Sequence, residues 1–356
     1  MFKQIIHGWE RKLSRRDNNR KVWPFDWGLE FLNGHTRDYR ASQDADNARR
    51  LLFEFNKRAI AESHLFFQHA PVADYSFDGH WLTFTSPVQT PYETNNTVYG
   101  RYFPVPDKQG AASSMAEDVA RARRRAVVVL PHWNADSESY VALCRLLNRA
   151  GLAALRLSMP YHDRRLLPGF VRAEYMVSAN LGRTLQACRQ AVHEARAAVD
   201  WLVAQGYDRI GLVGTSIGSC IGFLTFIHEE RLKAAAFNHV SSYFGDVVWE
   251  GISTAHVRRG LEPAVTREEV RQAWLAISPN SYINRLAGES RRGLFISARY
   301  DLSFTPELSN LLFEECDRHD VKFDRALVPW GHYTMGKFPF KYYDGYLIIN
   351  YLRKHL

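Results

Sequence analysis

Cysteine is scarce in this sequence, and its distribution argues against two classes of protein. The four cysteines, Cys144, Cys188, Cys220 and Cys316, are widely separated along the 356 residues. Disulfide scaffolds and zinc modules need cysteines that are dense or regularly spaced. The sequence therefore predicts neither a disulfide framework nor a metal site. Because 46% of the residues are hydrophobic, the chain can bury an ordinary core without such cross-links.

Long hydrophobic runs are also missing. No uninterrupted stretch reaches the roughly 18 apolar residues that a membrane-spanning helix needs. The opening residues, MFKQIIHGWERKLSRR, lack the apolar core and the small-residue cleavage site of a secretory signal. We therefore expect a cytoplasmic location.

The charge balance is basic, with 46 Lys and Arg against 38 Asp and Glu and a net charge of +8. No nucleic-acid-binding motif accompanies this charge, so we expect no nucleic-acid partner. The densest basic run, Arg121, Arg123, Arg124 and Arg125, precedes an apolar strand and fits a solvated linker. An anionic substrate or an acidic membrane surface stays compatible with the composition.

Residues 1–74 are predicted to form a helical extension. Two apolar stripes in it recur at steps of three and four residues, as on one face of a helix. The stripes are Phe2, Ile5, Ile6, Trp9 and Leu13, and Ala48, Leu51, Leu52, Phe55 and Ala59. Packing on the main domain is the simplest partner for both. For residues 2–13, which also carry Lys and Arg, a membrane-surface helix or a dimer helix is the alternative.

Residues 75–356 are predicted to form an α/β-class domain. Its first part alternates with period two and predicts an antiparallel pair of strands, followed by an exposed polar loop at 107–125. Apolar strands then alternate with helices, at 126–131, 152–160, 209–214, 234–240, 293–298 and 322–329. Such repeats give a mostly parallel central sheet with helices on both faces. Residues 241–292 interrupt the alternation and are predicted to be an inserted cap.

The segment RIGLVGTSIGSCIGFL carries the pattern G-x-S-x-G between an apolar strand and a helix. In that context the pattern is a nucleophile elbow, a sharp turn that projects the serine hydroxyl above the sheet edge. Gly214 and Gly218 would be small because neighbouring chain passes close to them. A glycine-rich turn without chemistry is the alternative, since the bare pattern is common. The flanking strand and helix favour Ser216 as a nucleophile.

A serine hydroxyl needs a base that takes its proton and an acid that fixes the tautomer of the base. Asp301 and His332 follow successive strands, at the carboxyl ends where catalytic groups of such sheets gather. Each residue alone could be structural, Asp301 as a helix N-cap and His332 as a loop histidine. Their order after Ser216 favours a Ser216, His332 and Asp301 triad. Asp246, which follows the preceding strand, is the alternative acid.

Residues 75–356 resemble an α/β-hydrolase. The segments GTSIG, PHWN, RYD and GHY correspond to its nucleophile, oxyanion, acid and histidine motifs. The organisation is similar to that of the dienelactone-hydrolase and acetyl-esterase-like serine hydrolases. This resemblance implies an ester-cleaving enzyme that uses no metal and no organic cofactor.

A tetrahedral intermediate needs two backbone N–H donors for its oxyanion. Ile217 directly follows the nucleophile and is the first candidate. Many α/β-hydrolases carry His-Gly-X in the loop after the strand at 126–131, and X supplies the second N–H. By that alignment Asn134 is the donor and Trp133 replaces the usual glycine, so both are candidates.

Other polar and aromatic residues are candidates for substrate contacts. They are His132, Tyr161, Arg164, Trp249 and Trp274. The arginine could hold an anionic group of the substrate, and the tryptophans of the cap could line an acyl pocket. A structural ion-pair network is the alternative for the loop at 158–169. His239 could face the site, but it is better explained as a buried, hydrogen-bonded histidine.

The predicted function is cofactor-free hydrolysis of a carboxylic ester, or of a thioester or amide, through an acyl-Ser216 intermediate. The partner is a small-molecule ester, with or without an anionic group. The alternatives are acyl transfer to an alcohol or amine and lipid deacylation at a membrane surface, the latter through peripheral membrane contact. A non-catalytic scaffold is disfavoured because all three triad members are present.

Overall fold

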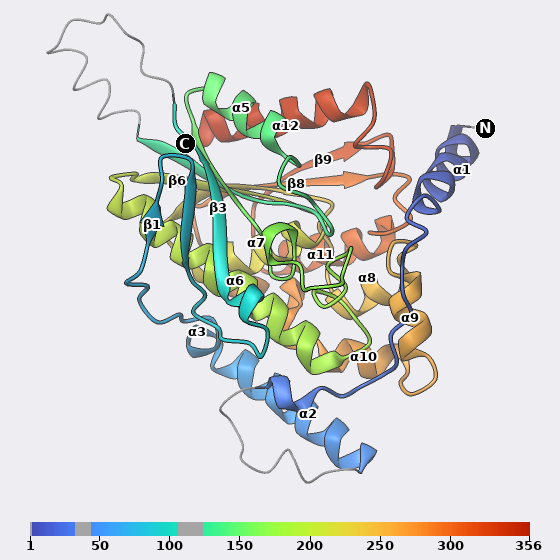
Figure 1. Cartoon of the computed structure of the whole chain (residues 1–356). Helices are drawn as coiled ribbons and strands as arrows, with labels where there is room; N and C mark the ends of the chain where they lie inside the picture. Colours follow the sequence, from blue (N-terminus) through green and yellow to red (C-terminus); the bar gives the residue numbers. More distant parts are fainter. Residues whose placement is uncertain (1, 33–43, 106–123) are drawn as a thin grey trace, which may run out of the picture.

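The computed structural model describes residues 2–32, 44–105 and 124–356. The exposed loop predicted at 107–125 lies outside these ranges except for its last two residues, and so do Arg121 and Arg123 of the basic run. The described chain folds around a central sheet with helices on both faces (Figure 1). The predicted architecture is therefore confirmed.

Within the described ranges the sheet has nine strands. They are β1 (Ser76–Phe77), β2 (Trp81–Thr85), β3 (Thr97–Phe103), β4 (Arg125–Leu130), β5 (Ala153–Leu157), β6 (Arg209–Thr215), β7 (Leu232–Asn238), β8 (Arg292–Ala298) and β9 (Asp324–Val328). Their spatial order is β1-β2-β3-β5-β4-β6-β7-β8-β9. The pairs from β1 to β5 are antiparallel, and those from β5 through β4 to β9 are parallel. The carboxyl ends of β6, β7, β8 and β9 therefore meet at one edge.

Helices cover both faces because the parallel strands are apolar on both sides. The larger core cluster takes Ala126 and Val128 of β4, and the second cluster takes Val127 and Val129. On the first face lie α6 (Leu181–Ala204), α7 (Ile217–His228) and α11 (Pro306–Arg318), and on the second lie α5 (Val141–Arg149) and α12 (Phe340–His355). None of the helices in the described ranges combines the length and the apolar character needed to cross a bilayer.

The N-terminal extension packs on the main domain, as the simpler of the two predictions has it. It contains α1 (Phe2–Ser14), η1 (Leu29–Phe31), α2 (Ala45–Ala61) and α3 (Ser63–Phe66). In α2, Leu52 and Phe55 belong to the larger core cluster. The first helix differs, because it buries Ile6 and Leu13 but leaves Phe2 and Ile5 50% and 57% exposed.

The interruption between β7 and β8 is helical. It consists of α8 (Phe244–Glu250), α9 (Ala255–Leu261), α10 (Arg267–Ala273), η5 (Leu275–Ile277) and η6 (Pro279–Leu286). The helix α10 begins with a capping box, in which Thr266 and Glu269 satisfy each other's backbone N–H groups. The role of this insertion as a cap over the substrate stays a prediction.

Candidate active site

A sharp turn at the carboxyl end of β6 presents Ser216. The residue has φ 58° and ψ −123°, a strained conformation for any side chain but glycine. A side chain at Gly214 would clash with the carbonyl of Gly218, and one at Gly218 would clash with the carbonyl of Leu130. Both glycines therefore let α7 begin this close to the sheet, in the manner of a nucleophile elbow.

Three side chains from three strand ends meet at this turn. Ser216 Oγ lies 3.1 Å from His332 Nε2, and His332 Nδ1 lies 3.2 Å from Asp301 Oδ2. The alternative acid, Asp246, lies elsewhere and is buried against arginines, with Arg271 Nη2 2.6 Å from its Oδ2. The structure thus brings together the three residues that the order of strands predicted.

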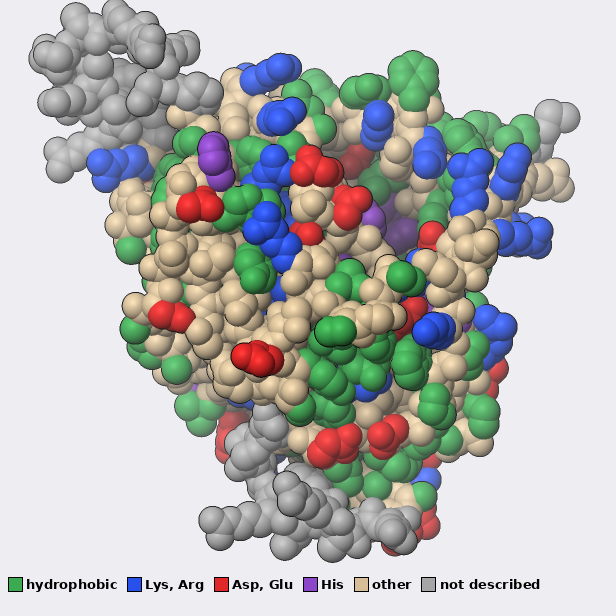
Figure 2. Space-filling model, viewed as in Figure 1, with side chains coloured by type: hydrophobic (Ala, Val, Ile, Leu, Met, Phe, Trp, Pro, Cys, Tyr) green, Lys and Arg blue, Asp and Glu red, His purple; other side chains and the backbone are tan. Residues whose placement is uncertain are grey.

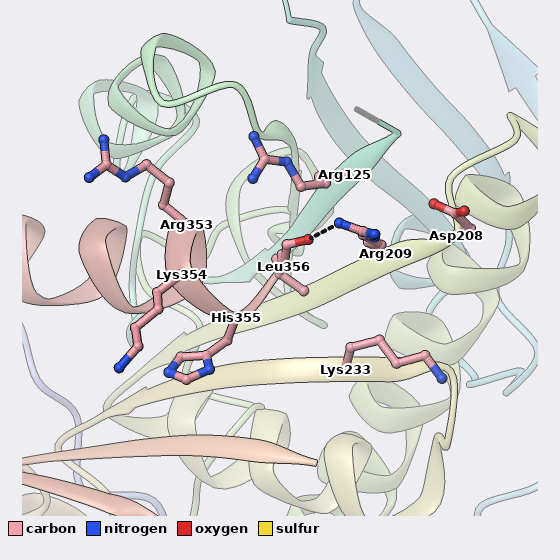
Figure 3. Close-up of a pocket in the computed structure, with 8 residues that line it drawn as sticks. All are labelled: Arg125, Asp208, Arg209, Lys233, Arg353, Lys354, His355 and Leu356. Atoms are coloured by element: carbon pink, nitrogen blue, oxygen red, sulfur yellow. Dashed lines mark hydrogen bonds between the residues drawn. The ribbon is translucent and has the colours of Figure 1, made fainter. Parts of the chain in front are cut away.

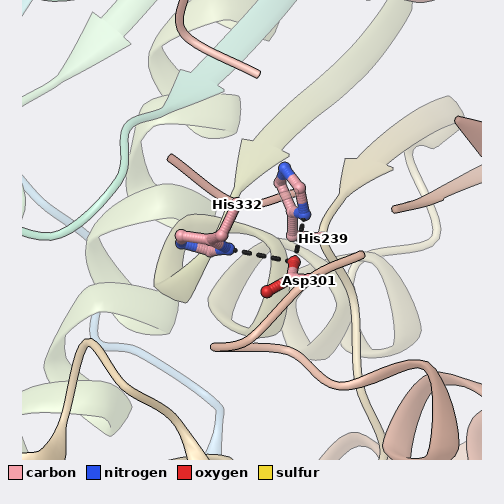
Figure 4. A group of neighbouring side chains, drawn as sticks. All are labelled: His239, Asp301 and His332. Carbon is pink, nitrogen blue, oxygen red and sulfur yellow. Dashed lines mark hydrogen bonds and ion pairs between the residues drawn. The ribbon is translucent and has the colours of Figure 1, made fainter. Parts of the chain in front are cut away.

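A second histidine contacts the same carboxylate (Figure 4). His239 Nδ1 lies 2.6 Å from Asp301 Oδ2, the oxygen that also faces His332. Asp301 Oδ1 accepts the backbone N–H groups of Ser303 and Phe304 at 2.7 and 2.8 Å. The carboxylate is thereby fixed in rotation. The prediction that His239 is a buried, hydrogen-bonded histidine is confirmed, and its hydrogen-bond partner is Asp301.

Burial and neighbouring charges together determine the pKa values of Asp301, His332 and His239. Burial alone would raise the pKa of Asp301, but the charges and hydrogen bonds of His332 and His239 hold it below its ordinary value. Burial would lower the pKa of His332, yet Asp301 and the charge of Glu10 raise it. Burial and the charge of His332 lower the pKa of His239. The two histidines therefore differ, and His332 is the one that can take a proton.

The same three side chains have the composition of a metal site. One ligand atom from each of His239, Asp301 and His332 lies within 4.8 Å of the others. The two hydrogen bonds to Asp301 Oδ2 already use both Nδ1 atoms, so an ion bound through these atoms would have to displace them. The hydrogen-bonded chain to Ser216 accounts for the arrangement without a metal.

Two candidate backbone N–H groups, one at the elbow and one in the loop after β4, have no acceptor among the described residues. Within residues 2–32, 44–105 and 124–356, neither Ile217 nor Trp133 donates a backbone hydrogen bond. The N–H of Asn134 instead donates to His162 Nε2 at 2.8 Å. The alignment that made Asn134 the second donor is therefore wrong, because its N–H is engaged, and Trp133 is the candidate that the geometry leaves.

Solved structures share this architecture at low sequence identity. Acetyl xylan esterase 1 from Thermoanaerobacterium sp. aligns with a TM-score of 0.56 and 17% identity, over 93% of this chain and 99% of its own. An acetyl xylan esterase from Paenibacillus sp. R4 gives 0.55 and 15%, over 92% and 99%. An esterase from Pyrococcus furiosus gives 0.51 and 13%, over 79% and 93%. No protein-family model and no curated protein matches the sequence.

The chain has the α/β-hydrolase fold. Its strand order, the turn at Ser216 and the near-complete coverage of both acetyl xylan esterases support this assignment. Within such a hydrolase fold, ligands bind at the carboxyl edge of the parallel strands. Ser216, Asp301 and His332 all lie at that edge, after β6, β8 and β9.

A basic hollow of about 570 Å³ lies at the opposite edge (Figure 3). It is lined by Arg125, Asp208, Arg209, Lys233, Arg353, Lys354, His355 and Leu356. Arg125 and Arg209 are the first residues of β4 and β6, so the hollow opens at the amino ends of the strands. It is separated from Ser216 by the length of β6 and takes no part in the candidate active site.

The loop at 158–169 is anchored by buried ion pairs. Arg165 is fully buried, and its Nη1 and Nη2 atoms lie 2.6 and 2.7 Å from the carboxylate of Glu194 in α6. Arg156 of β5 pairs with Asp163 at 2.9 Å. The structural network that was the alternative interpretation of this loop is therefore confirmed.

The two predicted substrate contacts of this loop are wrong. Arg164 lies over Trp81 of β2, with its guanidinium carbon 3.8 Å from the ring centre. The strand β2 is four positions from β6 in the sheet, about 19 Å at the usual strand spacing. Tyr161 is 1% exposed and packs against Tyr92 and Tyr175, so it faces no open pocket.

The other three predicted substrate contacts, His132, Trp274 and Trp249, have different outcomes. His132 is an exposed residue of the oxyanion loop, where its Nδ1 lies 3.0 Å from the hydroxyl of Tyr140, and its role with substrate stays a prediction. Trp274 is completely buried, and its indole N–H donates to the carbonyl of Leu181 at 3.0 Å. Its assignment to an acyl pocket is wrong, because it fills the core under the insertion. Trp249 is only partly buried and stays a candidate.

These two tryptophans form a matched pair for testing the pocket. Replacing Trp274 with Ala should lower the free energy of unfolding by about 3–5 kcal/mol and leave the ratio of hexanoate to acetate ester turnover unchanged, because a core side chain is lost. Replacing Trp249 with Ala should change that ratio with a smaller loss of stability. Melting temperature and the two turnover rates, measured on both variants, check this. An altered ratio in the Trp274 variant alone would reverse the assignment.

Glu10 in the N-terminal helix is a site residue that the sequence did not reveal. It is fully buried, and its carboxylate accepts the backbone N–H groups of Tyr333 and Thr334 at 3.0 and 2.7 Å. These residues directly follow His332. The helix α1 thus holds the loop that carries the histidine. No local pattern signals this, because the partners lie more than 300 positions later in the chain.

Replacing Glu10 with Gln should lower kcat by about tenfold, since charge-assisted hydrogen bonds that hold the His332 loop are weakened. It should also move the acid limb of the kcat/KM profile to lower pH. The limb falls where His332 becomes protonated, and removing the negative charge lowers the pKa of that histidine. A pH profile of the variant beside one of Lys12→Gln, an exposed change on the same helix, checks this. Equal profiles for both variants would limit Glu10 to a packing role.

Proposed function

We propose that this chain is a serine hydrolase that cleaves carboxylic esters through an acyl-Ser216 intermediate. The observation that carries the proposal is the line of contacts from Ser216 Oγ to His332 Nε2 at 3.1 Å and from His332 Nδ1 to Asp301 Oδ2 at 3.2 Å. A serine hydroxyl, an imidazole and a buried carboxylate in this order are the parts that acyl transfer to serine requires. Among solved structures of similar fold, the acetyl xylan esterases and the esterase favour an ester as substrate.

The first half-reaction forms the acyl-enzyme. Ser216 Oγ attacks the ester carbonyl carbon while its proton passes to His332 Nε2, and the carbonyl oxygen becomes an oxyanion. The N–H groups of Ile217 and Trp133 are the donors that would stabilise that oxyanion. The bond to the alcohol oxygen then breaks, and the alcohol leaves with the proton from His332.

The second half-reaction releases the acid. Water takes the place of the alcohol, and His332 removes its proton as the water oxygen attacks the acyl carbon. The bond to Ser216 Oγ breaks, and His332 returns the proton to the serine. Throughout, the ionised Asp301 stabilises the imidazolium and keeps the Nδ1 proton in place, which points Nε2 at the reacting atoms.

A panel of p-nitrophenyl esters of increasing acyl length tests this proposal. We expect a burst of p-nitrophenol equal to the enzyme concentration when deacylation is slow, and a steady rate afterwards. Product analysis with an added alcohol distinguishes hydrolysis from acyl transfer, because a transferase would convert most of the acyl group to a new ester. If the protein hydrolysed none of the esters in the panel, the proposal would be contradicted.

A further inference from the structure

Two segments far apart in the sequence meet beside the candidate active site. The helix α1 lies next to the amino-terminal end of α12 (Figure 1). The rings of Trp9 and Phe340 have centres 6.3 Å apart, and Phe340 stacks on Trp330 at 4.8 Å. Trp330 is two residues before His332. The outer surface of these segments therefore adjoins the loop that carries the histidine.

Exposed aromatic side chains gather on this surface. Of the six that the described residues expose, Phe77 is the one that lies elsewhere. The others, together with Ile5, form what we call the aromatic face: Phe2 (50% exposed), Ile5 (57%), Phe338 (75%), Tyr342 (61%), Tyr343 (52%) and Tyr346 (60%). Ring contacts join Phe338 to Tyr342 at 6.1 Å and Tyr343 to Tyr346 at 6.2 Å, and the contact of Trp9 with Phe340 brings α1 against them. Exposed apolar groups scattered singly need no explanation, but a group gathered on two adjoining segments indicates a binding surface.

The exposed charges of the two segments that form the aromatic face are of one sign. The cationic side chains that α1 and residues 337–346 expose are Lys3, Arg11, Lys12, Lys337 and Lys341. The carboxylates of the same two segments, Glu10 and Asp344, turn inward, and Asp344 accepts the side-chain N–H of Asn238 at 2.8 Å. Blue side chains accordingly line the part of the surface over α1 in Figure 2. The two segments therefore expose apolar groups together with cations and expose no carboxylate.

We propose that the aromatic face binds the surface of an anionic lipid bilayer. Tyrosine and phenylalanine rings insert at the level of the headgroups, and lysines beside them pair with lipid phosphates while their stems stay among the rings. A second copy of this chain fits less well, because a two-fold contact would bring the same lysines and arginines of both copies together. The proposal goes beyond ester hydrolysis and does not depend on it.

Flotation with lipid vesicles tests the proposal on the full chain. Vesicles of phosphatidylcholine with about one third phosphatidylglycerol should carry the protein upward, and vesicles of phosphatidylcholine alone should carry at least about tenfold less. Replacing Phe338, Tyr342 and Tyr346 with Ser should reduce binding to the anionic vesicles by at least about tenfold. Tyr343 is kept, because its ring packs on Trp330.

Matched variants separate the face from general surface effects. Lys337→Gln and Lys341→Gln should each weaken binding about fivefold, since a basic residue near an anionic membrane contributes at about that scale. Lys233→Gln and Lys322→Gln, exposed elsewhere, should not. Leu65→Ser in α3 and Val203→Ser near the end of α6 remove apolar groups that are 54% and 42% exposed on other elements, and they should leave binding unchanged.

Three results would overturn the proposal. The first is equal loss of binding in the control variants, and the second is absence of flotation with anionic vesicles. The third is a dimer in sedimentation that the aromatic triple variant abolishes, which would assign the face to a second copy. Ser216→Ala should float like the unaltered chain, and the triple variant should keep its turnover of a short soluble ester. Failure of membrane binding and failure of ester hydrolysis are therefore told apart.

Discussion

Replacing Ser216 with Ala should abolish labelling by a fluorophosphonate and lower turnover of an activated ester by at least about 10³-fold. The hydroxyl is the atom that a fluorophosphonate would phosphonylate, and within residues 2–32, 44–105 and 124–356 Ser216 is the serine whose hydroxyl lies at hydrogen-bond distance from a ring nitrogen of His332. Folding should be unaffected. Among the described residues the hydroxyl removed is hydrogen-bonded to that ring alone, and Ala occupies the same positive φ as Ser at similar cost.

Gel fluorescence with the probe, ester kinetics and the melting temperature measure these effects. Ser281→Ala is the matched control, because that hydroxyl donates to the carbonyl of Leu275 in the insertion and has no role at the elbow. It should label and turn over ester as the unaltered chain does. Undiminished labelling in the Ser216 variant would remove that serine from the role of nucleophile.

The site residues that could be predicted from sequence are those that directly follow a strand of the sheet. Ser216, Asp301 and His332 each follow an apolar strand of the sheet, and parallel strands bring their carboxyl ends to a common edge. The order of these segments along the chain therefore implied a meeting in space. The middle of the sheet could be predicted for the same reason, since β4 to β8 are buried on both faces.

The parts that could not be predicted depend on distant partners. Whether Asn134 or Trp133 offers a free N–H is decided by His162 Nε2, which belongs to another loop. Trp274 looks like any aromatic of an insertion until Leu181 is found to accept its N–H. Glu10 is an isolated acid in a basic helix, and its function depends on a loop near the other end of the chain. Periodicity and motif spacing carry no information about such contacts.

The N-terminal helix connects several of these observations. Its inner side presents Glu10 to the loop of His332, and its outer side presents Phe2 and Ile5 to the surroundings. A helix that only completed the core would bury its whole apolar stripe. The stripe is divided, with Ile6 and Leu13 buried and Phe2 and Ile5 exposed, and this supports the proposal that the outer side of α1 contacts a membrane surface.

Replacing Asp301 with Asn should lower ester turnover by about 10²–10⁴-fold, whereas Asp246→Asn should leave turnover nearly unchanged. An asparagine can keep the contacts of Asp301 Oδ1 by accepting the N–H groups of Ser303 and Phe304. Its NH₂ group then faces the Nδ1 atoms of both His332 and His239, where Asp301 Oδ2 accepts protons. His332 would have to move its own proton to Nε2, which places a donor instead of a base against Ser216.

The Asp246 variant is the control because the carboxylate of Asp246 is equally buried but pairs with two arginines of α10, Arg267 and Arg271. Its loss should cost about 1–3 kcal/mol in the free energy of unfolding, as charge-assisted hydrogen bonds do, and leave the tautomer of His332 alone. Turnover and melting temperature of both variants decide between the two acids. Lost activity with full stability in Asp246→Asn, beside near-normal activity in Asp301→Asn, would transfer the role to Asp246. The geometry argues against that outcome, since Asp301 Oδ2 is the carboxylate oxygen 3.2 Å from His332 Nδ1.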